Sequence, residues 1–74
     1  MNILTQLGMR IRYLRKQKGM SQLDLALEAE INKNYISDLE RGCRNPSILI
    51  LEKIAKALEV SLEMLFQGIE SFED

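Results

Sequence analysis

The sequence predicts an all-α fold, a compact bundle of five short helices that contains a helix-turn-helix. Apolar residues recur at helical spacing in short blocks, and Ser or Asn precedes most blocks as a helix N-cap. No stretch alternates between apolar and polar residues as a half-buried strand would, and the chain has only 1 proline. At 74 residues there is room for one domain with one modest core. We therefore expect one domain over residues 1–68 and a short acidic tail at residues 69–74.

The first helix is expected from about residue 5 to residue 18. Its apolar stripe follows the i, i+4, i+7 spacing of one helix face: Leu7, Ile11 and Leu14. Gly19 suits the position after the helix, where the left-handed conformation is common. Ser21 then begins a second helix at about residues 22–29, because Asp24 follows it at capping-box spacing.

A short turn separates the second helix from a third, expected at about residues 33–41. Ile31 is an apolar plug in this turn, and Asn32 is the N-cap of the third helix. Two residues of the third helix point to the core: Ile36 and Leu39. Gly42 is expected to end it.

Two further helices are expected after Pro46, which disfavours helix at the preceding residue. Ser47 caps the first of them, which runs to about residue 58, and Ser61 caps a last one that runs to about residue 67. The longer helix has a stripe that we expect to be buried: Ile48, Leu51, Ile54, Ala55 and Leu58.

The charge of the chain is unevenly distributed. The formal net charge is −1, but residues 1–45 carry +3 and residues 46–74 carry −4. A basic half that faces phosphates and an acidic half that faces away suit DNA binding, although charges on a solvated surface also vary by chance.

Several classes of function have no support in the sequence. The chain has no histidine and 1 cysteine, Cys43, so we expect neither an internal disulfide nor a metal site. We expect no cofactor, no small-molecule ligand and no enzymatic activity, because no paired-carboxylate cleft or phosphate loop is present and a pocket has little room. No apolar run approaches the roughly 20 residues of a membrane span, and no signal peptide is evident. We therefore expect no membrane partner and a cytoplasmic location.

The outer face of the third helix carries side chains that match the edges of base pairs. Lysine donates to guanine, asparagine pairs with adenine, aspartate accepts from cytosine and serine is permissive. The expected base contacts are Lys33, Asn34, Ser37 and Asp38. Asp38 is the least comfortable of them near phosphates, unless Arg41 neutralises it. Residues around this face are expected to contact phosphate, with plain solvated side chains as the alternative: Gln22, Asn32, Tyr35, Arg41, Arg44 and Asn45.

Motifs across most of the chain carry a family resemblance. In one register the sequence reads Gly-x-Ser-Gln at residues 19–22, Leu-Ala at residues 25–26, Ile-Ser at residues 36–37 and Leu-Glu-Arg-Gly at residues 39–42. The chain resembles the phage-repressor and Cro-like helix-turn-helix proteins, which implies a lambda-repressor-like DNA-binding domain. Its short length and its Asn-Tyr-Ile-Ser and Arg-Asn-Pro-Ser runs are most similar to the controller proteins of restriction–modification systems. That similarity implies a homodimer on a palindromic operator.

The resemblance also implies roles for particular residues. An ion pair of Arg15 with Glu40 would tie the end of the first helix to the end of the third, and neither charge could be buried alone without a cost of roughly several kcal/mol. Gln22 would contact phosphate, and the third helix from Lys33 onward would carry specificity. Glu30 departs from the family, because many relatives have glycine there and a left-handed residue other than glycine costs about 1 kcal/mol.

Apolar residues in the last two helices exceed what the core needs. The surplus predicts a homodimer interface: Leu49, Ile50, Leu62, Met64, Phe66 and Ile69. The alternative is a loosely covered core edge in a very small domain. A symmetric dimer would place two recognition helices about 34 Å apart, one turn of the duplex.

Two hypotheses of function remain open. The first is a sequence-specific transcriptional regulator that binds double-stranded DNA as a homodimer, either as a repressor or as an activator. Activation would need contact with RNA polymerase, for which acids on the second helix such as Glu28 or Glu30 are candidates. The second is an antitoxin or adaptor module that binds a partner protein through its apolar C-terminal surface.

Overall fold

The computed structural model describes residues 2–70, which contain five helices joined by turns and loops. They are α1 (Ile3–Gln17), α2 (Gln22–Ala29), α3 (Lys33–Glu40), α4 (Ile48–Leu58) and α5 (Leu62–Leu65). These described residues contain no strand, so the predicted five-helix, all-α class is confirmed. Within the same range, no helix combines the length and the apolar character needed to span a bilayer.

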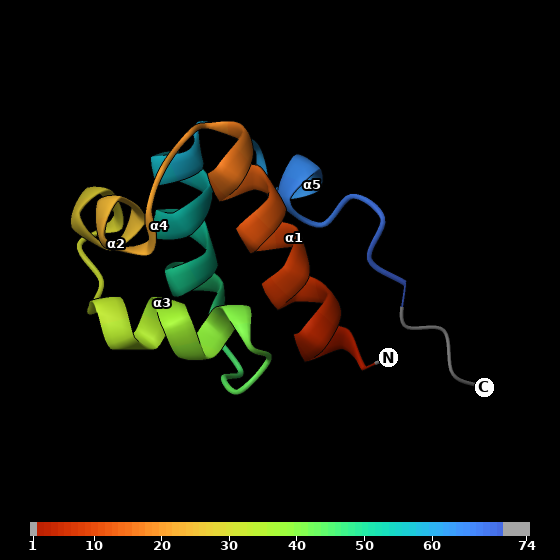
Figure 1. Ribbon diagram of the computed structural model, residues 1–74. Helices are drawn as coiled ribbons and strands as arrows, with labels where there is room; N and C mark the ends of the chain where they lie inside the picture. The colour runs from red at the N-terminus through yellow and green to blue at the C-terminus, as the bar shows by residue number, and fades with distance from the viewer. Residues whose placement is uncertain (1, 71–74) are drawn as a thin grey trace.

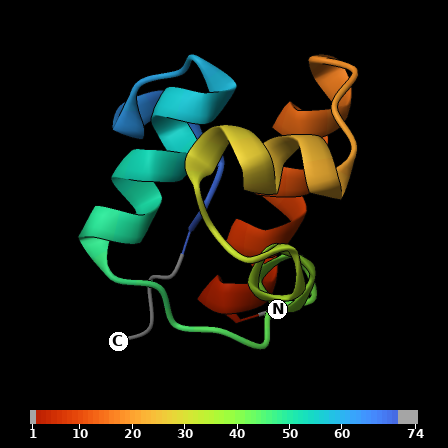
Figure 2. The same ribbon diagram turned by 90° about the vertical axis from the view of Figure 1, so that its left-hand side faces the viewer.

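The arrangement leaves α3 along one edge of the molecule. Figure 1 shows α3 below α2 and α4, with the loop to α4 beside its C-terminal end. In the view turned by 90°, α3 is seen end-on beneath α2, which crosses it (Figure 2). α3 packs against α2 and α1 on its inner side. Its outer side is therefore left to solvent.

One apolar core joins all five helices. Seven large side chains in it are fully buried: Ile11, Leu25, Ile36, Leu39, Ile54, Leu58 and Leu65. Each contributes about 1.5–3 kcal/mol relative to exposure. Helices this short are marginal in isolation, so packing of their apolar faces holds them in place. The four-residue α5 depends on its single buried leucine.

Every helix begins at an Asn or Ser whose side chain accepts a hydrogen bond from a first-turn backbone N–H. The expected capping box is present: the Asp24 N–H donates to Ser21 Oγ at 2.9 Å, and the Ser21 N–H donates to the Asp24 carboxylate at 2.9 Å. The Ser21 backbone bond, and then the bond from its hydroxyl, hold the pKa of Asp24 below its ordinary value. Asn2 caps α1, which explains why this helix starts at Ile3 and not near residue 5.

The ends of α2 and α4 adopt the left-handed conformation without glycine. Glu30 has φ 57° and Glu59 has φ 58°. At Glu30 this is the turn anticipated from the family pattern, whereas nothing in the sequence signalled it at Glu59. The α3 terminus uses Gly42 at φ 79°, with the Cys43 N–H donating to the Asp38 carbonyl at 2.9 Å. That bond is the six-to-one bond of a Schellman motif, and it fixes the direction of the loop after α3.

Gly8 is required for a close approach that the apolar pattern did not reveal. A Cβ at this position would lie 2.5 Å from both the Leu39 and the Glu40 carbonyl oxygens. No side chain fits at that distance. α1 therefore touches the last turn of α3 backbone to backbone.

Two expectations about the second half of the chain are wrong. Ile48 was placed in the buried stripe of α4, but it is 61% exposed, because it is the first residue of the helix and lies beyond the core. α5 ends at Leu65, two residues before the expected end, and a turn follows it.

Contacts with the domain continue past Gly68. Ile69 packs on the core, and the Glu70 backbone exchanges two hydrogen bonds with the Gln6 side chain, at 2.8 and 3.0 Å. The rest of the expected acidic tail, residues 71–74, lies outside the described residues.

Glu30→Gly should stabilise the domain. Glycine removes the left-handed penalty of about 1–2 kcal/mol and raises the entropy of the unfolded chain, for a net gain of roughly 0.5–1 kcal/mol. Glu28→Gly is the matched control, because the same exchange inside α2 should lower stability by about 1 kcal/mol. Urea denaturation of both variants measures the difference. A loss of stability in Glu30→Gly would contradict the conformational argument.

Candidate nucleic-acid interface

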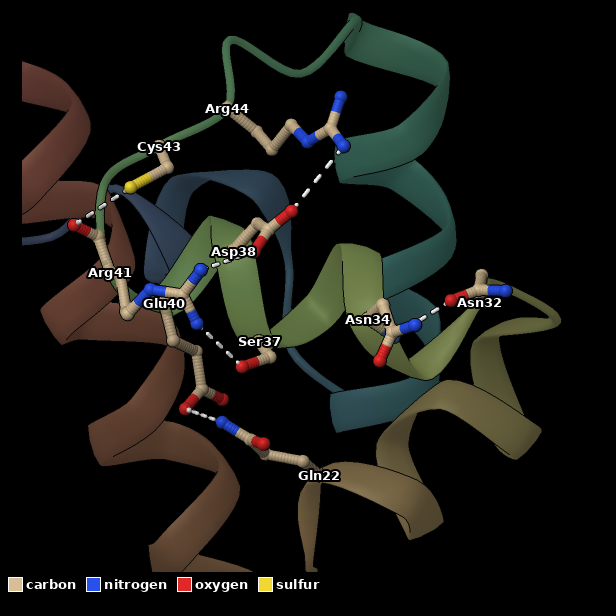
Figure 3. Close-up of polar contacts among 9 residues, drawn as sticks. All are labelled: Gln22, Asn32, Asn34, Ser37, Asp38, Glu40, Arg41, Cys43 and Arg44. Carbon is tan, nitrogen blue, oxygen red and sulfur yellow. Dashed lines mark hydrogen bonds and ion pairs between the residues drawn. The ribbon is translucent and has the colours of Figure 1, made fainter.

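The N-terminal end of α3 presents the least constrained of the predicted base-contact side chains. Lys33 and Asn34 are exposed, and Lys33 has no hydrogen-bond or ion-pair partner among residues 2–70. The Asn34 side chain is also free there, since only its backbone N–H is engaged, donating to Asn32 Oδ1 at 2.7 Å. Figure 3 shows Asn34 lying apart from the charged residues at the other end of the helix. Both side chains are free to meet another molecule.

The C-terminal half of α3 carries a charged cluster, which we call the Asp38 cluster: Asp38, Arg41 and Arg44. Arg41 pairs with one carboxylate oxygen of Asp38, and Arg44 Nη2 lies 3.3 Å from the other (Figure 3). Arg41 also donates to Ser37 Oγ at 2.9 Å. Ser37 and Asp38, both predicted to contact bases, are thus already hydrogen-bonded within the protein.

Tyr35 joins α3 to the following loop. Its ring packs partly against the core, and the Arg44 guanidinium lies 5.2 Å from the ring centre. This distance is typical of a cation–π contact. Arg41, Arg44 and Asn45 are exposed, as expected for residues that contact phosphate. Asn32 is exposed as well; its Oδ1 accepts the capping hydrogen bond, and its amide N–H groups are the donors that a phosphate would need.

A buried ion pair lies behind α3. Arg15 Nε is 2.6 Å from Glu40 Oε2, and Arg15 Nη2 is 3.0 Å from Glu40 Oε1. The two side chains are only 8% and 2% exposed. Arg15 Nη1 donates to the Met20 carbonyl at 2.8 Å. The pair implied by the family resemblance therefore exists in the structure. Its hydrogen bond to Glu40 raises the pKa of Arg15, against the lowering effect of burial.

Gln22 is part of this network, which sequence reasoning missed. Its Nε2 donates to Glu40 Oε1 at 3.0 Å (Figure 3). A glutamine amide has two N–H donors, so one remains for phosphate while the other is held by Glu40. The only available signal was that Ser21-Gln22 and Glu40 both belong to the resembling motifs; their contact has no spacing signature.

The positive charge of residues 1–45 is less available to DNA than its sum suggests. Arg10 is bound to the end of α5, donating to the Met64 carbonyl at 2.9 Å and to Gln67 Oε1 at 3.3 Å. Arg15 is buried, and Lys18 pairs with Glu59. The interpretation that the whole basic half faces phosphate is therefore wrong for these residues, because each has a partner elsewhere in the fold.

The predicted dimer residues divide into two groups. Leu49 is 67% exposed and Met64 is 44% exposed. The others are partly buried against the core: Ile50, Leu62, Phe66 and Ile69. Ile48 adds to the exposed group, next to Leu49.

The described residues contain no group of three or more His, Cys, Asp or Glu side chains that could hold a metal ion. Cys43 is exposed beside the Asp38 cluster, with its Sγ 3.9 Å from the Arg41 carbonyl oxygen.

Comparison with known proteins identifies the class. A helix-turn-helix family model matches residues 11–65. The control protein C.BamHI of Bacillus amyloliquefaciens is 48% identical over 60 residues, which are 80% of this chain and 74% of that protein. The transcriptional regulator DdrOP3 of Deinococcus deserti is 38% identical, but this chain spans only 50% of its length. The chain belongs to the helix-turn-helix family.

Solved structures point to a narrower group within that class. The restriction–modification controller protein C.AhdI from Aeromonas hydrophila has a TM-score of 0.84 and 40% identity, over 85% of this chain and 96% of that one. C.Esp1396I bound to a 25 base pair operator site also has a TM-score of 0.84, with 39% identity over 93% of this chain and 91% of that one. The resemblance to restriction–modification controller proteins is thereby confirmed.

Removing Glu40 should destabilise the domain strongly. Glu40→Ala leaves the Arg15 guanidinium buried without its partner, which typically costs about 3–5 kcal/mol. Replacing both, as Arg15→Met with Glu40→Leu, should cost much less, because no unpaired charge remains. Thermal and urea denaturation measure the three proteins. Equal losses in the single and double variants would contradict the assigned role. Glu59→Ala, which breaks the exposed pair with Lys18, is the control and should change stability little.

Proposed function

We propose that this chain is a sequence-specific DNA-binding transcriptional regulator that binds a palindromic operator as a homodimer and controls a restriction–modification system. The observation that carries the proposal is the exposed outer face of α3. The inner face of this helix packs against α1 and α2, and the side chains of Lys33 and Asn34 at its N-terminal end are exposed. The similarity to C.Esp1396I on its operator supports placing this face in a major groove.

Lys33 and Asn34 are the proposed principal base contacts. They sit at the N-terminal end of α3, which enters the groove most deeply in helix-turn-helix proteins. Lysine reads guanine O6 and N7, and asparagine pairs with adenine. Ser37 and Asp38 lie one turn later and must exchange an internal hydrogen bond for any contact with a base.

Phosphate contacts are proposed on both sides of that helix. Gln22 and Asn32 lie at the starts of α2 and α3, each with an N–H group directed by an internal hydrogen bond. Beyond the end of α3, Arg41, Arg44 and Asn45 are exposed. Tyr35 is partly buried, and its hydroxyl is the proposed donor to phosphate. Contacts of this kind set the register of a protein on the duplex without reading sequence.

Dimerisation is proposed because a single α3 is too short to specify an operator. Its 8 residues span about 12 Å, which covers only a few base pairs. Leu49 and Met64 are the exposed apolar candidates for the interface, and the partly buried residues next to them would complete it: Ile50, Leu62, Phe66 and Ile69.

In this function the protein performs no catalytic step, and it acts in the cytoplasm, where the operator DNA lies. Contact with RNA polymerase belongs to this function only if the regulator activates, and then exposed acids such as Glu28 and Glu30 are the candidates. The relatives described above are named as regulators and control proteins, which favours this hypothesis over an antitoxin or adaptor.

The test is selection of bound sequences from a pool of randomised duplexes at near-physiological salt. Recovery of a two-fold symmetric consensus supports a dimeric regulator and supplies its operator. Recovery of no consensus, with only weak salt-sensitive binding, would contradict the proposal.

Lys33→Ala and Asn34→Ala should each weaken binding to the selected operator by about 1–3 kcal/mol per contact and relax the consensus at one base pair of each half-site. The dimer should remain, because both residues are exposed on α3 and do not contribute to the packing of the core. Fluorescence anisotropy measures affinity and sedimentation measures assembly.

Lys56→Ala is the matched control for the lysine variant. Lys56 lies in the last turn of α4, beside the end of α1 and away from α3. It should keep full operator affinity. An equal loss in this control would mean that Lys33 contributes only general charge.

A further inference from the structure

We propose that Asp38 sets the strength of DNA binding without reading a base: it restrains Arg41 and Arg44 and so weakens the phosphate contacts made with any duplex. This deepens the proposed function and rests on it. The role differs from the cytosine contact expected from the sequence, and the two make opposite predictions.

Both oxygens of the Asp38 carboxylate are engaged by arginines. Oδ1 pairs with Arg41, and Oδ2 lies 3.3 Å from Arg44 Nη2. The carboxylate is itself only 27% exposed. In Figure 3 it lies between the two guanidinium groups. The amino group of a cytosine would have to share this carboxylate with both arginines.

Each arginine is also held at a second point. Arg41 donates to Ser37 Oγ at 2.9 Å, and the Arg44 guanidinium lies 5.2 Å from the centre of the Tyr35 ring. Two attachments fix a planar guanidinium better than one. The Asp38 cluster is therefore an ordered unit on the outer side of α3, where a free arginine would otherwise reach a phosphate.

The electrostatic consequence is measured most directly on non-specific DNA. Such binding consists almost entirely of phosphate contacts, each of which releases counterions. With Asp38 ionised the cluster carries +1, whereas two free arginines would carry +2. Base contacts by Lys33 and Asn34 are unaffected by this restraint. Asp38 thus lowers affinity for every duplex, through the phosphate contacts that all duplexes offer.

The experiment uses Asp38→Asn, which keeps the size of the side chain and removes its charge. Affinity for a duplex of scrambled sequence and for the selected operator is measured by anisotropy from 50 to 200 mM salt. Each arginine released to a phosphate should steepen the salt dependence by about 0.9 in log K against log salt. That slope corresponds to an affinity gain of about 3.5-fold per contact for a fourfold drop in salt. Affinity for both duplexes should rise by a similar factor, because the released arginines contact phosphate on either one.

Two controls separate this mechanism from charge alone. Glu28→Gln makes the same change in net charge on α2, beside Lys18 and Lys56 and away from the Asp38 cluster, and should leave the slope unchanged. Adding Arg41→Gln and Arg44→Gln to Asp38→Asn should abolish the gain. Circular dichroism confirms that each variant is folded before binding is measured.

Two results would overturn the inference. One is an unchanged slope and affinity on scrambled DNA. The other is a loss confined to the operator, which would make Asp38 a base reader. Failure of the proposed function is distinguishable from both, because it is the absence of any consensus for the unsubstituted protein, whatever Asp38→Asn does on scrambled DNA.

Discussion

The buried ion pair between Arg15 and Glu40 fixes the position of α3, and every contact proposed for DNA depends on that position. Its two hydrogen bonds, at 2.6 and 3.0 Å, join the last turn of α1 to the last turn of α3. An apolar pair of similar volume would hold the helices at least as tightly. A guanidinium paired edge to edge with a carboxylate also sets the orientation of α3. Gly8 completes the arrangement, since α1 and α3 meet there with no side chain between them.

The same carboxylate links the core to the candidate interface. Glu40 accepts from Arg15 on its buried side and from Gln22 at the start of α2, at 3.0 Å. The orientation of the Gln22 amide is therefore set by its hydrogen bond to the buried Glu40. An aligned donor loses less entropy on meeting a phosphate than a freely rotating one. Through Glu40, the element that positions the recognition helix also positions a proposed phosphate contact on the neighbouring helix.

The fold could be predicted from the sequence because its signals are local. Ser21, Asn32, Ser47 and Ser61 mark helix starts in the sequence and cap helices in the structure. Apolar spacing identified the buried hydrophobic residues of α1, α3 and α4. The predictions from sequence fail where the position of a residue depends on contacts with residues distant in sequence. Ile48 has the right spacing for the core but lies outside it, and no pattern shows that Gly8 touches α3. The exposure of Lys33 and Asn34 followed from helical periodicity, whereas the partners of Gln22 and Arg10 are set by tertiary packing alone.

A chain of net charge −1 raises the question of how it would bind a polyanion at all. The answer lies in where the cationic side chains are and which of them have partners within the protein. Arg10 donates to a carbonyl of α5, and Lys18 pairs with Glu59 at the end of α4. Arg15 is buried in its ion pair with Glu40. A lysine lies at the N-terminal end of α3 and two arginines lie at the other, with Asp38 between those arginines. Arg12 and Lys16 are exposed on α1. The internal pairing of Arg10, Arg15 and Lys18 reduces the number of phosphate contacts, which lowers affinity for random DNA. Under such conditions the base contacts of a short helix account for a larger share of the total binding free energy. A weakly charged protein of this kind therefore depends on its base contacts to bind any one site tightly.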